Sequence, residues 1–403
     1  MVNFDEIKYD FINTNNSIDT THSTLDRLIW YLIIIFAASD IFSIAVVQIA
    51  AGVLMLLFII KKIVYGNFSF LKNPFVIPFS CFILARILSV VLSTNFNLSY
   101  PSLYKEIVFY FMFFVLISEI DINDKSKVIL LLQVIIGSAA IAAIYGIGVY
   151  LFIDKGRITS TTSGYYTLGM YLTASLAISI MLGKYNEIFI KRILWWIINL
   201  ILVLGILLTF DRIHWLGMTI AVIIAGILKE RKLLIIYFAA VIAAVLFYPA
   251  FYERFMNAVQ EMTFSERNVI WKGAYMLAGK HPIFGFGPGT FREIFPLYND
   301  IFDKGVSSWH NDFLQVYMEG GIIGLGAFLY LIISIYVNGF KSLKIFKQQN
   351  NTFFKDLTGA LMLSILTFLI GGFILNPITT LLFLIVVGLL ALLTTESLSA
   401  SSS

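Results

Sequence analysis

Twelve apolar stretches, most of them joined by short polar connections, constrain the fold of this chain more than any other feature. Each is long enough to form a helix that crosses all or most of a hydrocarbon core about 30 Å thick. None alternates between apolar and polar residues as a strand of a membrane barrel would. The sequence therefore predicts an all-α integral membrane protein with about twelve transmembrane helices. The stretches cover residues 27–39, 42–60, 74–93, 105–120, 128–152, 166–183, 193–210, 213–228, 233–250, 312–337, 357–375 and 377–394. The divisions at Asp40 and Asn376 are the weakest, since the apolar sequence around each could also form a re-entrant hairpin.

The amino-acid composition excludes several classes of protein. Of the 403 residues, 59% are hydrophobic and 13% are charged, and the mean hydropathy is +0.88. Soluble domains average roughly 45–50% apolar and ~25% charged residues. A soluble enzyme, a disordered chain and a nucleic-acid-binding protein are therefore excluded. The single cysteine, Cys81, excludes an intrachain disulfide and a cysteine-based zinc site.

Basic residues in the connections predict the orientation of the helices. With the N-terminus in the cytoplasm, the inner connections carry fifteen Lys and Arg residues and the short outer connections carry four. This bias follows the positive-inside rule. The inner residues are Lys61, Lys62, Lys72, Lys125, Lys127, Lys184, Lys191, Arg192, Lys229, Arg231, Lys232, Lys341, Lys344, Lys347 and Lys355, and the outer ones are Lys105, Lys155, Arg157 and Arg212.

The same pattern divides the chain into five segments. Residues 1–26 form a polar cytoplasmic tail, 27–250 hold nine transmembrane helices and 311–394 hold three. The low-complexity residues 395–403 are predicted to form a disordered tail. Between the ninth and tenth helices, residues 251–310 form a long outer loop, and an ordered loop of this length usually serves a function.

Two signatures predict short helices inside the long loop. Thr263 with Glu266, and Thr290 with Glu293, have the spacing of a capping box. Between them lies a glycine-rich run, Gly285-x-Gly287-x-Gly289, which no strand precedes. We therefore exclude a nucleotide-binding loop and expect the glycines to permit tight turns and close backbone packing. The sequence has no HExxH motif and no other metal-ligand spacing, so we predict neither a metal nor a cofactor.

Four basic side chains near the outer face could hold an anionic substrate. They are Arg212 at the start of the eighth helix, Arg267 on the first loop helix, Arg86 within the third helix and Lys105 at the start of the fourth. A guanidinium can donate two parallel hydrogen bonds to a phosphate and stays protonated. Burying Arg86 costs at least ~2.5–3.5 kcal/mol unless it lines a polar cavity or finds a partner. Taken singly, each of the four also fits a structural role as a solvated, snorkelling or ion-paired side chain.

His310 is the best candidate for a general base. Ser308 can cap the helix that follows, which would place His310 in the first turn. The positive end of a helix disfavours an imidazolium, so the ring should stay neutral and able to accept a proton. A single His near a membrane interface is more often structural, but the chain has only four His residues.

Three groups of motifs resemble those of the O-antigen ligase/polymerase superfamily. The first is Arg212-Ile-His-Trp-Leu-Gly217. The second runs from Ser265-Glu-Arg267 to Trp271 and continues with His281-Pro-Ile-Phe-Gly-Phe-Gly-Pro-Gly-Thr-Phe291. The third is His310-Asn-Asp-Phe-Leu-Gln315, followed by Glu319-Gly-Gly-Ile-Ile-Gly324. Together they cover about residues 205–326.

The resemblance implies a GT-C-like glycosyltransferase of the bacterial inner membrane with its active site on the periplasmic face. Its donor would be a glycan on undecaprenyl diphosphate, and neither a metal nor another cofactor would be needed. His310 matches the family's general base, and Arg212 and Arg267 match its two prominent arginines. Lys105 matches a basic residue before the fourth helix, and Arg86 and Lys105 would help to hold the diphosphate.

Three functions remain open. A ligase would transfer the glycan to a sugar hydroxyl of lipid A-core, and a polymerase would transfer it to another carrier-linked repeat. The outer connection at about residues 153–165 is short, which favours the ligase. A transporter of lipid-linked sugars is less favoured, because the sequence shows no internal repeat and Arg86 is the only basic residue deep in a predicted helix.

Overall fold

The computed structural model describes residues 24–402, apart from 162–163, 248–252, 254–255, 257–266, 301–305, 307 and 373–376. Each of the twelve predicted apolar stretches is a helix within the described part of the chain. These helices are residues 24–39, α2 (Ile44–Tyr65), α3 (Val76–Val91), α4 (Phe96–Glu119), α5 (Lys125–Phe152), α6 (Tyr165–Met181), α8 (Arg192–Leu208), α9 (Arg212–Leu228), α10 (Lys232–Phe247), α14 (Asp312–Gln348), α15 (Thr352–Gly371) and α16 (Pro377–Ser402). Short helices η1 (Ser69–Lys72), α7 (Asn186–Phe189), α12 (Arg267–Leu277), α13 (Phe291–Ile294) and η2 (Tyr298–Asp300) lie between them.

The longest helices match the thickness of a membrane. Among the described residues, six helices are long and apolar enough to cross one, α2, α4, α5, α14, α15 and α16, and the shorter apolar helices of 10–17 residues include α3, α6, α8, α9 and α10. Residues facing outward from α2 and α8 are large and apolar, as a lipid environment requires. The architecture is that of a multi-pass integral membrane protein, and the number of twelve crossings stays a prediction.

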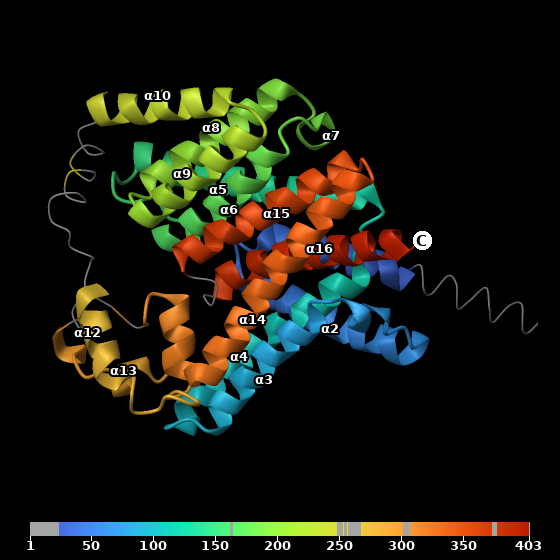
Figure 1. Cartoon of the computed structure of the whole chain (residues 1–403). Helices are drawn as coiled ribbons and strands as arrows, with labels where there is room; N and C mark the ends of the chain where they lie inside the picture. Colours follow the sequence, from blue (N-terminus) through green and yellow to red (C-terminus); the bar gives the residue numbers. More distant parts are fainter. Residues whose placement is uncertain are drawn as a thin grey trace, which may run out of the picture.

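Hydrogen bonds between the connections sort the helix ends into two sets. At one end, the α12 end, the Asp312 N–H donates to the Gly372 carbonyl (3.1 Å), which joins the start of α14 to the end of α15. At the opposite end, the α7 end, the Tyr185 hydroxyl donates to the Thr352 carbonyl (3.1 Å), which joins the α6–α7 connection to the start of α15. Figure 1 shows α12 and α13 at one end of the bundle and α7 at the other. Helices α14 and α15 therefore run in opposite directions between the two ends.

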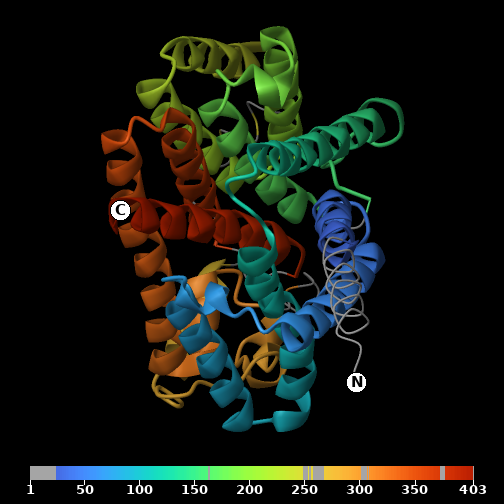
Figure 2. The ribbon, with the colours of Figure 1, turned by 90° about the vertical axis from the view of Figure 1, so that its right-hand side faces the viewer.

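Helix α16 forms the centre of the bundle (Figure 2). It packs against α4, α14, α15 and α6, and its Leu382, Leu390 and Leu393 are fully buried. The predicted disordered tail at 395–403 is instead helical through Ser402. The reason is that polar side chains at this end of α16 have partners on α14, since the Ser342 hydroxyl bonds to Ser397 (3.0 Å).

Helix α4 begins nine residues earlier than predicted, at Phe96. The Asn95 side chain caps it by accepting a hydrogen bond from the Leu98 N–H (3.4 Å). Lys105 therefore lies inside α4 and does not open it. Hydropathy missed this first part of α4 because its polar residues, such as Ser99, bond to the long loop and do not face lipid.

Candidate functional site at the α12 end

The glycine-rich run of the long loop is held in turns that favour glycine. Gly285, Gly287 and Gly289 have φ values of 70°, 99° and 74°, in the left-handed region. A Cβ on Gly285 would lie 2.4 Å from the Glu319 carbonyl carbon, and one on Gly287 would lie 2.1 Å from the Ser93 hydroxyl. The prediction of tight turns and close backbone packing is confirmed.

Backbone hydrogen bonds fix this run between α14 and the α3–α4 connection. The Phe286 N–H donates to the Met318 carbonyl (2.8 Å) and the Gly287 N–H donates to the Glu319 carbonyl (3.0 Å), both on α14. On the other side, the Phe286 carbonyl accepts hydrogen bonds from the Thr94 N–H (3.1 Å) and hydroxyl (3.0 Å) in the α3–α4 connection. The loop is therefore part of the framework of the α12 end.

A kink in α14 makes room for the loop. Gly321 has φ 62° and ψ −158°, which is not helical. A Cβ there would lie 2.3 Å from the Ile283 carbonyl carbon. Past the kink, the Ile322 N–H donates to the Pro282 carbonyl (2.8 Å), so the carbonyl of the loop replaces a bond that the helix has lost.

Arg86 of α3 bonds to Glu319, one of the α14 residues that hold the loop. It lies in a buried cluster with two carboxylates. Its guanidinium donates to Glu319 (2.8 Å) and to both oxygens of Glu106 (2.7 and 2.9 Å). The Arg86 side chain is 1% exposed and the Glu106 side chain is 20% exposed. The Tyr110 hydroxyl also bonds to Glu106 (3.0 Å). The cluster carries one cation and two carboxylates, and the guanidinium is directed at the protein's own acids.

The sequence predicted that Arg86 needs a partner but did not identify either acid. The sequence did contain a signal for these partners. Burying an acidic residue inside an apolar helix costs as much free energy as burying a basic one, so a buried acid is expected to pair with a buried base. Glu106 lies 20 residues from Arg86, on the next helix. Glu319 lies 233 residues away, so its pairing follows from the fold and not from local sequence.

An aromatic cluster holds the segment before α14. Trp309 is 1% exposed and packs edge-on against Phe291 (4.8 Å between ring centroids) and Phe295 (5.8 Å). Phe295 in turn fits against α12, where a Cβ on Gly273 would lie 2.2 Å from its ring. Both predicted loop helices, α12 and α13, thus belong to one apolar unit with Trp309.

The two predicted capping boxes have different outcomes. Thr263 and Glu266 lie outside the described residues, although the helix predicted after them is α12. Thr290 makes no capping bond to α13; its hydroxyl donates to the Gly287 carbonyl (2.7 Å). Glu293 accepts from the Asn95 amide (2.9 Å). The helix prediction at α13 was right and the cap was wrong, because the Thr290 backbone is itself helical (φ −82°, ψ −7°), whereas an N-cap residue needs an extended backbone.

His310 lies just before α14 and not in its first turn. Asn311 is the N-cap, since its side chain accepts from the Leu314 N–H (3.0 Å). The prediction that Ser308 caps this helix was therefore wrong. His310 has φ 49°, an uncommon conformation for a residue other than glycine, of the kind that clusters at functional sites. Buried Trp309 on one side and the Asn311 cap on the other hold the backbone in this conformation.

Arg212 is the first residue of α9. Asp211 before it caps the helix, with its carboxylate accepting from the Ile213 N–H (3.1 Å). In the first turn of α9, buried His214 packs edge-on against Tyr166 of α6 (4.8 Å). A Cβ on Gly169 of α6 would lie 2.3 Å from the His214 ring, so glycine is required for α9 to approach α6 this closely.

The end of α15 joins the starts of α9 and α14. A Cβ on Gly371 would lie 3.9 Å from the His214 ring, and one on Gly372 would lie 3.7 Å from the Asn311 amide. The segments that carry Arg212 and His310 therefore approach two adjacent glycines, the first near Gly371 and the second near Gly372. The side chains of the other two predicted residues, Arg267 at the start of α12 and Lys105 in α4, lie outside what the structure describes.

The apolar bundle, and an ordered loop docked at the end where Arg212 begins α9 and His310 precedes α14, define a polytopic membrane protein. Within the described residues, no three His, Cys, Asp or Glu side chains gather as metal ligands. The family model described as O-antigen ligase matches residues 197–329, which places this segment in the O-antigen ligase/polymerase superfamily. The matched segment includes Arg212, Arg267 and His310, and excludes Arg86 and Lys105. A search of curated proteins gives no match.

Proposed function

We propose that this protein is an O-antigen ligase that moves a glycan from undecaprenyl diphosphate to a sugar hydroxyl of lipid A-core. The observation that carries the proposal is that the start of α9, with Arg212, lies near Gly371, and the segment before α14, with His310, lies near the adjacent Gly372. Arg212 and His310 both lie within the segment matched by the O-antigen ligase family model.

The orientation of the bundle supports a periplasmic site. The fifteen basic residues predicted to be cytoplasmic include Lys125, Lys184 and Lys229, and these lie at the α7 end. Cytoplasmic connections attract such residues. The α12 end, with the docked loop, would then face the periplasm of a cell whose inner membrane holds the bundle.

In the proposed reaction, the hydroxyl oxygen of the acceptor attacks the anomeric carbon of the donor glycan. The bond between that carbon and the phosphate oxygen breaks, and its electron pair leaves with undecaprenyl diphosphate. His310 takes the hydroxyl proton as general base. Arg212 and Arg267 hold the diphosphate, whose charge grows as the bond breaks. A direct displacement of this kind inverts the anomeric carbon.

Arg86 has a different role in this proposal from the one predicted for it. Two carboxylates occupy its guanidinium, and 1% of the side chain is exposed, so we assign it to positioning α14 beneath the glycine-rich run. Lys105 keeps its proposed contact with the diphosphate, one residue from Glu106 on α4.

The test is a transfer assay with the purified full chain in proteoliposomes. Undecaprenyl-diphosphate glycan is supplied with lipid A-core or with a second carrier-linked repeat. We expect glycan to appear on lipid A-core. Chain growth on the carrier alone would identify a polymerase, and no transfer to either acceptor, with glycan crossing the bilayer instead, would identify a transporter.

A further inference from the structure

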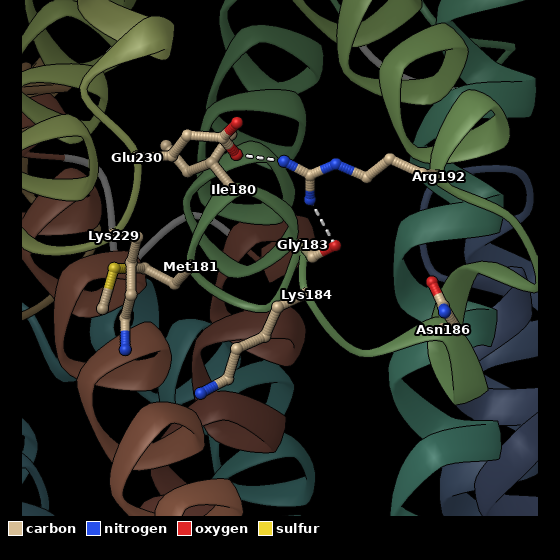
Figure 3. Close-up of a pocket in the computed structure, with 8 residues that line it drawn as sticks. All are labelled: Ile180, Met181, Gly183, Lys184, Asn186, Arg192, Lys229 and Glu230. Atoms are coloured by element: carbon tan, nitrogen blue, oxygen red, sulfur yellow. Dashed lines mark hydrogen bonds and ion pairs between the residues drawn. The ribbon is translucent and has the colours of Figure 1, made fainter.

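A second polar site lies at the α7 end, opposite the site described above. A cavity of 310 Å³ opens there between the end of α6 and the start of α8 (Figure 3). Its lining includes three cationic side chains, Lys184, Arg192 and Lys229, and one carboxylate, Glu230. The proposed transfer reaction uses none of these residues.

The Arg192 side chain lines this cavity and is held in place by three contacts. Its guanidinium donates to the Gly183 carbonyl (2.6 Å) and pairs with Glu230; both bonds are visible in Figure 3. It also stacks over the Trp195 ring at 3.9 Å, a favourable cation–π distance. Glu230 neutralises this cation, so the net charge of the cavity depends on the two lysines.

Lys184 and Lys229 share one buried carboxylate. Lys184 lies 2.8 Å from Asp356, Lys229 pairs with the other oxygen, and Lys355 lies 3.9 Å away. The Asp356 side chain is 1% exposed, whereas that of Lys184 is 55% exposed. The hydrogen bond to Asp356 raises the pKa of Lys184, so this lysine is charged at neutral pH. Of these three ammonium groups, Lys184 and Lys229 line the cavity, and with the one carboxylate of Asp356 they leave an excess of one positive charge.

Exposed apolar side chains lie close in sequence to two of the lining residues, Arg192 and Lys229. Ile190 and Ile193, on either side of Lys191 and Arg192, are 71% and 62% exposed, and Leu228, next to Lys229, is 63% exposed. A small free anion would bind through contacts with the cationic side chains alone. A molecule with a phosphate group and hydrocarbon chains would use both the cations and this apolar surface.

We infer that this cavity binds the phosphate headgroup of an anionic lipid, with Lys184 and Lys229 contacting the phosphate and the acyl chains lying on Ile190, Ile193 and Leu228. Basic pockets between helices on the cytoplasmic side of a membrane have the charge and position for such headgroups. The site is independent of the proposed transferase function, because its residues lie at the other end of the bundle.

The test is a lipid titration of the purified full chain in an uncharged detergent, followed by native mass spectrometry. We expect phosphatidylglycerol to bind at least about tenfold more tightly than phosphatidylcholine. The variant Lys184→Gln/Lys229→Gln should bind phosphatidylglycerol roughly thirtyfold more weakly, since each Lys near a lipid surface contributes about 1 kcal/mol. The matched control Lys344→Gln/Lys347→Gln removes two exposed lysines of α14 outside the cavity and should bind as the wild type does.

A second variant covers the case in which loss of two lysines around Asp356 prevents folding. Asn186→Glu adds a carboxylate to the lining and leaves every lysine in place, and it should also weaken phosphatidylglycerol binding. Equal binding of the two lipids, or wild-type binding by Asn186→Glu, would overturn the inference. Inorganic phosphate is added as a competitor. If it displaced phosphatidylglycerol at millimolar concentration, the site would be one for free phosphate and the lipid assignment would fail.

Discussion

Arg86 and Glu319 form a buried ion pair of 2.8 Å between α3 and α14. The backbone carbonyl of Glu319 also accepts the N–H of Gly287 (3.0 Å). One residue of α14 therefore connects a charged cluster inside the bundle with the loop docked on its end. The position of the loop therefore depends on the ion pairs that Arg86 makes with Glu319 and Glu106.

Replacing Arg86 with Gln should destabilise the protein by about 3–5 kcal/mol, because Glu319 and Glu106 would remain without their cation. The measurement is the free energy of unfolding in mixed micelles. The double variant Arg86→Gln/Glu319→Gln should lose less than the single variant, since it removes the buried uncompensated carboxylate. A single variant as stable as the wild type would show that the cluster does not hold α3 to α14.

Replacing Gly285 with Ala should move the loop, because the new Cβ would lie 2.4 Å from the Glu319 carbonyl carbon at a φ of 70°. The left-handed backbone alone costs about 1–2 kcal/mol. A displacement near 1 Å can lower a rate by about 10²-fold, so we expect the glycan transfer rate to fall more than tenfold.

Gly279→Ala is the matched control for this loop. No atom lies within 4 Å of a Cβ there, and its φ is not in the left-handed region. Its transfer rate and stability should equal those of the wild type. Equal effects at the two glycines would mean that the docking of the loop is irrelevant to transfer.

The sequence predicted the helices well and their polar ends less well. Hydropathy locates apolar helices because burial in lipid requires long uninterrupted apolar stretches. It missed the first two turns of α4, where Asn95 caps the helix and Ser99 donates a hydrogen bond to the Pro288 carbonyl of the loop. It also missed the last turns of α16, whose Ser397 bonds to α14. Both depend on contacts between segments far apart in the chain.

In the candidate site, too, local sequence does not reveal contacts between segments that are far apart in the chain. Ser308 and Asn311 are both good helix caps three residues apart, and local sequence does not distinguish them. Asn311 caps α14 in the structure, with Trp309 buried against Phe291. The need of Arg86 for a partner follows from the cost of a buried charge, whereas the choice of Glu319 requires the fold.

His310→Asn should strongly lower turnover while the protein stays folded. Asn tolerates the left-handed backbone seen at His310 (φ 49°) better than most residues, so the substitution removes the imidazole and keeps the local conformation. General base catalysis contributes about 10²–10⁴-fold, and we expect a loss of that size in single-turnover transfer. The control Asn311→Ser keeps a cap on α14 and should retain most of the rate. Near-normal turnover of His310→Asn would exclude this imidazole as the base.

Arg212→Lys should lower the transfer rate by roughly 10²–10³-fold. Lysine keeps the positive charge at the start of α9 but lacks the planar pair of donors that a diphosphate accepts. The control Arg231→Lys makes the same change at an exposed residue of the α9–α10 connection at the α7 end, and it should leave the rate unchanged. Because charge is conserved in both variants, a selective loss at Arg212 would show that two-point contact matters. Full activity of Arg212→Lys would instead mean that this guanidinium serves the fold and that another group holds the leaving diphosphate.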